Sequence, residues 1–166
     1  PMSNNIQKYN NERKTEKLAK IRLTNSLELD TDLITTRCKF NFYYFDNNNA
    51  GQDFIQWDKK QLVNLLKKLT TFSASSLKDW KKEGTLIIYG QFPISAKTDF
   101  KEPDNIPIEA QWGRFRLGSK IRLVGFTIPS RFDDLEHHKT KQRWDTNTFY
   151  VVFLDAEHKF FKIEEK

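Results

Sequence analysis

The chain has 166 residues, enough for one ordinary domain with extensions, and a separate second domain is not expected. Its residues are 37% hydrophobic and 14% aromatic, with 14 Phe and one Met, which is sufficient for an aromatic core and favours a fold with a β-sheet. The formal net charge of +6 suits a phosphate-rich partner such as RNA or DNA, and equally a basic surface that has no such partner.

Several classes of site and protein are disfavoured by what the sequence lacks. Cys38 is the only cysteine, which excludes an internal disulfide, and its apolar neighbours predict a buried thiol rather than a nucleophile. Without a long apolar run or a signal-peptide core, the chain is expected to be cytoplasmic and not to associate with a membrane. The sequence contains no P-loop, dinucleotide-binding glycine pattern, GxSxG or CxxC motif, so no cofactor is expected.

Residues 1–30 are polar and charged, with too few apolar side chains for a clear amphipathic face. They predict a polar basic arm that is partly helical or disordered, and that either grips nucleic acid or is a solvated tail. Residues 31–166 are expected to form a single α+β domain with inserts at 90–111 and 129–147.

The first half of this domain predicts one strand and two helices. Aromatic residues alternate in Arg37–Phe45, which indicates a strand. The helices are indicated by leucines at i, i+3, i+4 and i+7, by a capping-box pair of Asp58 and Gln61, and by Gly84 after a short segment, Leu77–Glu83. Together they predict a helical hairpin.

The second half is rich in strand signals. The predicted strands are Thr85–Tyr89, Arg114–Leu117, Lys120–Ile128 and Phe149–Leu154, and residues 155–157 turn the chain into a final segment, 158–163. The near-continuous apolar character of 120–128 predicts a central strand that is covered on both faces. We therefore expect an α+β fold, with an N-terminal strand and a helical hairpin packed on a mostly antiparallel β-sheet.

The same region is cationic. Arg114, Arg116, Lys120 and Arg122 lie within nine positions that contain no acidic residue. Side chains alternate along a strand, so Arg114 and Arg116 are expected on the face opposite Phe115. This pattern indicates an anion-binding face. The alternative is that the arginines face solvent and prevent edge-to-edge pairing of sheets.

The segments RFRLGSKIRLVGFTI (114–128) and TFYVVFLDAEHKFFKI (148–163) resemble the RelE/HigB/YoeB group of ribosome-dependent mRNA interferases. Members of that group show a basic-apolar-basic strand, a small turn, an RLVY-like strand, a hydrophobic strand and a terminal basic or His-containing segment. The resemblance extends over roughly residues 38–163, including the helical hairpin. It implies a toxin-like, metal-independent RNA endonuclease that acts on RNA or at the ribosome, with a neutralising antitoxin protein as a further partner.

The resemblance also implies roles for individual residues. Arg114 and Arg116 match the paired basic residues of the family's first cleft strand, and Arg122 matches the arginine at the scissile phosphate. His158 or Lys159 takes the place of the terminal residue that transfers a proton or stabilises charge. The candidate site residues are, for catalysis, Arg122, His158 and Arg116, and, for nucleic-acid binding, Arg114, Lys120, Lys159 and Arg131.

The chemistry of metal-independent RNA cleavage fits these residue types. Guanidinium groups bind phosphate oxygens in a bidentate manner, and a histidine with a pKa of about 6.5 suits proton transfer. An ordinary surface histidine is the alternative for His158. We expect Arg122→Ala to abolish cleavage and to change stability by less than about 1 kcal/mol, as a surface substitution does.

Other aromatic and histidine residues leave alternatives open. Trp112, Trp144, Phe132 and Phe149 either stack on bases or pack in the core or a lid. His137 and His138 lie in an acidic loop, but their spacing argues against a metal site. The alternative functions are a non-catalytic nucleic-acid-binding module and a protein-interaction factor, either of them from a bacterial or mobile-element defence system.

Overall fold

The computed structural model describes residues 10–20, 33–47 and 50–162, and it divides into two units, Pro1–Thr35 and Thr36–Lys166. In the first unit, residues 10–20 form a helix whose side chains are exposed. The remainder of the predicted arm over residues 1–30 lies outside the described residues. In the three described ranges, no helix is both long and apolar enough to cross a membrane.

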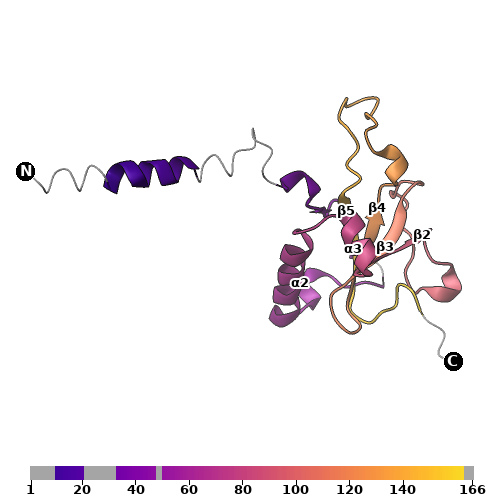
Figure 1. Ribbon diagram of the computed structural model, residues 1–166. Helices are drawn as coiled ribbons and strands as arrows, with labels where there is room; N and C mark the ends of the chain where they lie inside the picture. Colours follow the sequence, from indigo (N-terminus) through magenta and orange to yellow (C-terminus); the bar gives the residue numbers. More distant parts are fainter. Residues whose placement is uncertain (1–9, 21–32, 48–49, 163–166) are drawn as a thin grey trace, which may run out of the picture. The chain divides into compact units, whose positions relative to one another are not determined.

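The second unit is the predicted α+β fold (Figure 1). Its helices are α2 (Lys59–Phe72) and α3 (Leu77–Glu83), and its strands are β1 (Lys39–Asn41), β2 (Leu86–Gly90), β3 (Gln111–Arg116), β4 (Arg122–Thr127) and β5 (Thr148–Asp155). Single 3-10 turns are η2 (Ile34–Thr36), η3 (Phe54–Gln56), η4 (Ser95–Lys97) and η5 (Ser130–Phe132). The strand order is β1-β5-β4-β3-β2. β1 is parallel to β5 and the other neighbours are antiparallel, so the sheet is mostly antiparallel, as predicted.

The helical hairpin is confirmed, and its ends are set by local hydrogen bonds. The Asp58 carboxylate accepts from the Gln61 backbone N–H at 2.7 Å, and the Gln61 side chain accepts from the Asp58 N–H at 2.9 Å. This capping box satisfies two backbone donors at the start of α2. Gly84 follows α3 with φ of 78°, a left-handed conformation that glycine adopts without a steric penalty.

The prediction of a strand over Arg37–Phe45 is wrong in length, because β1 has only three residues. A turn closes directly after it, where the Phe45 N–H donates to the Phe42 carbonyl at 3.1 Å. The turn also ends the alternation, since Phe40 packs in one core cluster and Tyr44 in the other. Cys38, just before β1, is buried as predicted.

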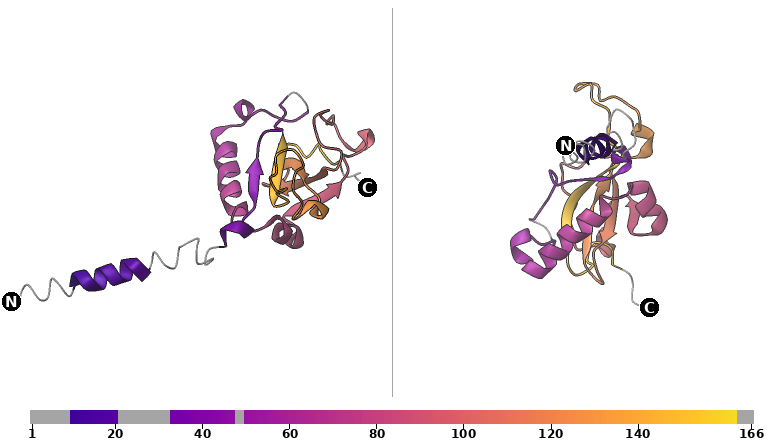
Figure 2. Two further views of the ribbon diagram at one scale, coloured as in Figure 1. Left: turned by 90° about the horizontal axis from the view of Figure 1, so that it is seen from above. Right: turned by 60° about the vertical axis from the view of Figure 1, so that its left-hand side comes forward.

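The two faces of the sheet carry separate core clusters. α2 lies along one face (Figure 2), which we call the helix-covered face, where its Leu65 and Phe72 join Phe115 of β3 in the first cluster. The opposite face is the loop-covered face. Its cluster includes Trp112 of β3, together with aromatic residues from the connection 91–110 and the segment 156–162.

β4 is the centre of the sheet, as the apolar run predicted. All six of its residues are buried, and it pairs with β3 on one side and β5 on the other. The register shifts between Val124 and Gly125, where the backbones approach so closely that a Cβ on Gly125 would lie 2.0 Å from the Tyr150 carbonyl oxygen. Only glycine fits at this point of the ladder.

Candidate anion-binding site

Three arginines meet where β3 ends and β4 begins. Arg116 and Arg122 are opposite each other in the antiparallel register, and Arg114 is two residues earlier on β3. Because Phe115 lies in the cluster of the helix-covered face, Arg114 and Arg116 belong to the loop-covered face, as the alternation predicted. None of the three arginines forms an ion pair with any residue in the described ranges. We call Arg114, Arg116 and Arg122 the arginine cluster.

Arg122 is buried, with 6% of its surface exposed. Its Nη1 donates to the carbonyls of Gly118 and Ile121, both at 3.0 Å, while its buried Nε has no partner among the described residues. A buried guanidinium is costly without a counter-charge. The solvent-facing alternative therefore does not apply to Arg122, and the expectation that Arg122→Ala behaves as a surface substitution is wrong.

The other two arginines are each oriented by one hydrogen bond. Arg114 is half-buried, and its Nε donates to the Tyr89 hydroxyl at 2.9 Å. Arg116 is exposed, and its Nε donates to the Gly118 carbonyl at 3.1 Å. Both side chains keep their Nη groups free of protein partners in the part of the chain that the structure describes. Those groups are the donors that bind phosphate in a bidentate manner.

His158 belongs to the same electrostatic environment. It is half-buried in the turn after β5 and has φ of 62°, in the left-handed region that non-glycine residues seldom adopt. Burial lowers the pKa of His158, and the positive charges of Arg122 and then Arg114 lower it further. The imidazole is therefore mainly neutral at neutral pH, which is the form that accepts a proton.

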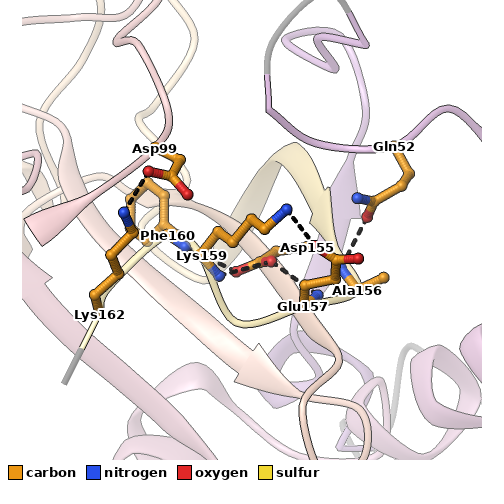
Figure 3. A network of polar contacts seen from close by, with 8 residues as sticks. All are labelled: Gln52, Asp99, Asp155, Ala156, Glu157, Lys159, Phe160 and Lys162. Atoms are coloured by element: carbon orange, nitrogen blue, oxygen red, sulfur yellow. Dashed lines mark hydrogen bonds and ion pairs between the residues drawn. The ribbon is translucent and has the colours of Figure 1, made fainter. Parts of the chain in front are cut away.

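Asp155 holds the turn that carries His158 (Figure 3). It is the last residue of β5 and only 1% exposed. Its carboxylate accepts three backbone N–H groups of the turn: Glu157 at 3.2 Å, Lys159 at 3.0 Å and Phe160 at 2.9 Å. Hydrogen bonds to a charged acceptor are stronger than neutral ones, so this network offsets the backbone strain at His158.

The segment 156–162, which begins with this turn, is attached to neighbouring loops at both of its ends. The Gln52 side chain accepts from the Ala156 N–H at 2.8 Å. Further along, Lys162 forms an ion pair with Asp99 (Figure 3), and its N–H donates to the Lys97 carbonyl at 2.8 Å. These contacts join the turn to two separate parts of the domain, and so they fix the position of His158.

Besides His158, three of the predicted site residues lie outside the arginine cluster. Lys159 pairs with Glu157, which raises the pKa of Lys159, and its role in place of His158 stays a prediction from the resemblance. Lys120 is exposed in the turn between β3 and β4. Arg131 follows the opposite end of β4, and its guanidinium lies 5.2 Å from the centroid of the Phe132 ring.

The four candidate stacking residues separate into two pairs. Trp112 and Phe149 are 1% and 0% exposed and belong to the core. Phe132 and Trp144 lie in the insert 129–147, with ring centroids 5.5 Å apart. The insert projects from the sheet as the orange loop of Figure 1. Within the described ranges, no three His, Cys, Asp or Glu side chains gather as a metal site.

Sequence reasoning missed two residues that shape the site. The sequence pattern places Tyr89 only in a strand and Asp155 only in a turn, and indicates no role at the site for either residue. Asp155 had one usable signal, since an acidic residue directly follows the most apolar strand. Its position opposite Arg122 in the register shows that the two groups face a shared end of the sheet.

Comparisons of the chain with protein-family models, with curated proteins and with solved structures found no match. The geometry of the arginine cluster and of His158 therefore carries the functional interpretation by itself.

Proposed function

We propose that this protein is a toxin-like, metal-independent RNA endonuclease that holds the scissile phosphate on the arginine cluster. The supporting observation is that three guanidinium groups, one of them buried, converge without a direct ion pair among the described residues. The carboxylate nearby, Asp155, partly offsets the lowering of the Arg122 pKa by burial and by the other two arginines, but it accepts its hydrogen bonds from backbone N–H groups of its own turn. Among the described residues, three arginines face this one carboxylate, so the site keeps an excess of positive charge that a phosphate would balance, and a phosphate also suits the geometry of guanidinium donors. His158, which these charges influence, is the acid–base group of the site.

Cleavage needs few steps from these residues. Neutral His158 takes the proton of the RNA 2′-OH, whose oxygen then forms a bond to the adjacent phosphorus. The bond from phosphorus to the 5′-oxygen breaks, and that oxygen receives a proton from water. The products are a 2′,3′-cyclic phosphate and a 5′-hydroxyl. The arginine cluster stabilises the extra negative charge of the pentavalent transition state, where one such contact is worth about 100- to 1,000-fold in rate.

RNA, free or on the ribosome, is the partner that this proposal requires. A neutralising antitoxin protein and a cytoplasmic location remain predictions from the sequence. The second candidate function is a module that binds nucleic acid without cleaving it. It is favoured by one observation: His137 and His138 lie in the insert 129–147, so among the described residues His158 is the single histidine in the turn beside the arginine cluster.

The test is incubation with total RNA at low salt in EDTA, with and without ribosomes. We expect products that end in a 2′,3′-cyclic phosphate, and a rate at least 100-fold lower for Arg116→Ala, since Arg116 is exposed and its loss leaves the core intact. Lys67→Ala is the matched control, because it removes one exposed charge from α2 instead.

Three outcomes discriminate between the functions. Cleavage that disappears only in EDTA contradicts the metal-independent scheme. Binding that weakens steeply with salt, without any product, supports the binding module. The absence of both binding and cleavage contradicts both functions, and supports a protein partner for the basic surface.

A further inference from the structure

A second candidate site lies on the loop-covered face, between the sheet and the insert. It is a pocket of about 280 Å³. Its aromatic lining residues are Tyr44, Phe126, Phe132, Trp144 and Tyr150. We call this the aromatic pocket. Ile128, Pro107 and Pro129 complete its apolar wall, and the exposed carboxylate of Glu109 also lines it.

The rings of the pocket come from three parts of the fold: the turn after β1, which carries Tyr44, the paired strands β4 and β5, and the insert. On the sheet side, Phe126 and Tyr150 are neighbours on β4 and β5, with ring centroids 4.9 Å apart and planes within 10°. On the insert side, Phe132 and Trp144 meet at 65°. The insert thus contributes ring surfaces to a pocket whose other rings belong to the sheet and, for Tyr44, to the turn after β1. A flat, apolar group fits such a site better than a bulky chain segment does.

The aromatic pocket and the arginine cluster lie along the same strand. Arg122 is the first residue of β4, and Phe126 lies four positions later, a separation of about 13 Å at the usual rise per residue. A strand of RNA held by its phosphate at the cluster reaches this far within a few nucleotides. Arg131 lies beside Phe132 at the start of the insert and adds a cation to those of the arginine cluster; it forms no ion pair in the described ranges.

We propose that the aromatic pocket binds one nucleobase of the RNA strand whose phosphate lies on the arginine cluster, an inference that rests on the proposed function. Base–aromatic stacking supplies the affinity, because every base has a flat π-face. Glu109 supplies the preference, since a carboxylate accepts from the amino group of cytosine, adenine or guanine, whereas the only ring donor of uracil on that edge, N3–H, lies between two carbonyl oxygens that repel a carboxylate. The pocket therefore selects against uracil and gives the site a base preference near the cut.

The experiment uses the full chain, labelled with nitrogen-15 and titrated by NMR. The probes are non-cleavable 2′-O-methyl RNA trimers of A, C, G and U, and an abasic ribose-phosphate trimer of equal charge. The indole N–H of Trp144 reports binding in the wild-type protein, and the backbone N–H groups of Phe126 and Tyr150 report it in every variant. The variants are Trp144→Ala, the ring-preserving control Trp144→Phe, and Glu109→Gln, which replaces an acceptor by an amide that also donates.

We expect the A, C and G trimers to bind about tenfold or more tightly than the abasic trimer, in keeping with the usual contribution of one stacked base. Trp144→Ala should reduce their affinity to the abasic level, whereas Trp144→Phe should retain most of it. Glu109→Gln should bring uracil to the level of the other bases. Arg116→Ala should weaken all trimers, the abasic one included, by the same factor.

Failure of the pocket is distinct from failure of the proposed function. If the abasic trimer binds as tightly as the others, the aromatic pocket does not bind a base, while the arginine cluster still binds phosphate. Base-dependent affinity that survives in Trp144→Ala also overturns the inference, because the base then lies elsewhere. If no trimer binds, both proposals fail. A proline-containing peptide that shifts the Trp144 indole when the trimers do not would assign the pocket to a protein partner.

Discussion

Asp155→Asn is the substitution that most sharply tests how the site is built. The change keeps the size of the side chain but removes its charge and one acceptor oxygen. In the wild-type protein, Oδ1 accepts from Glu157 and Lys159, and Oδ2 accepts from Phe160 at 2.9 Å. Asparagine can retain the oxygen that serves two donors, but its NH₂ group then faces the Phe160 N–H without bonding to it.

The expected effect follows from this loss. One hydrogen bond to a charged acceptor is worth about 1.5–3 kcal/mol, and the two that remain become neutral and weaker. The site is 1% exposed, so water does not replace the lost partner. We expect the free energy of unfolding to fall by about 3 kcal/mol. The negative charge of Asp155 also raises the pKa of His158, so the variant should lower that pKa further.

Two measurements check this prediction. Urea unfolding gives the stability, and an NMR titration of the His158 ring gives its pKa. Glu157→Gln is the matched control, because it removes an exposed carboxylate from the same turn and should change neither quantity appreciably. If Asp155→Asn unfolds at the same urea concentration as the wild type and leaves the His158 titration unchanged, Asp155 does not position the turn.

Three further predictions concern the rest of the domain. Folding lowers the pKa of His158, so between the folded-state pKa and the ordinary pKa of about 6.5 the unfolded state binds more protons than the folded state. The free energy of unfolding, measured with urea, should therefore fall as the pH decreases through this window. The fall should be smaller in His158→Gln. Gly125→Ala should destabilise the fold by about 3 kcal/mol in the same assay, since its Cβ would meet the Tyr150 carbonyl; an unchanged midpoint would contradict the close packing of β4 and β5. Burial raises the pKa of Cys38 to about 11, so a thiol reagent at pH 8 should modify it only after unfolding, and rapid labelling of the folded chain would refute the buried position.

The helices were predictable because their signals are local. Asp58 and Gln61 are three residues apart and cap α2 by themselves, and Gly84 ends α3 through its own backbone conformation. β1 was less predictable, since its length depends on pairing with β5 near the other end of the chain. Aromatic residues at alternate positions indicate a strand, but they do not show where a turn moves the next ring to the opposite face.

The arginine cluster was predictable in part because its signal, like those of the helices, is local in sequence. Arg114, Arg116 and Arg122 are close in sequence, so one strand, one turn and one register bring them together. The burial of Arg122 was not predictable from sequence alone, because this side chain is covered only when the loop-covered face is complete. The positions of Asp155 and Tyr89 depend on the order of strands in the sheet, which no local pattern contains.

The central claim is that an RNA phosphate lies on the arginine cluster beside His158, and one titration tests it most directly. The His158 ring is followed by NMR across pH 4–9, with and without a non-cleavable 2′-O-methyl RNA trimer. We predict that the pKa of His158 is below 6.5 in the free protein, and that the trimer raises it, because a bound phosphate offsets the charges of Arg122 and Arg114. A pKa that saturating trimer leaves unchanged would contradict the claim.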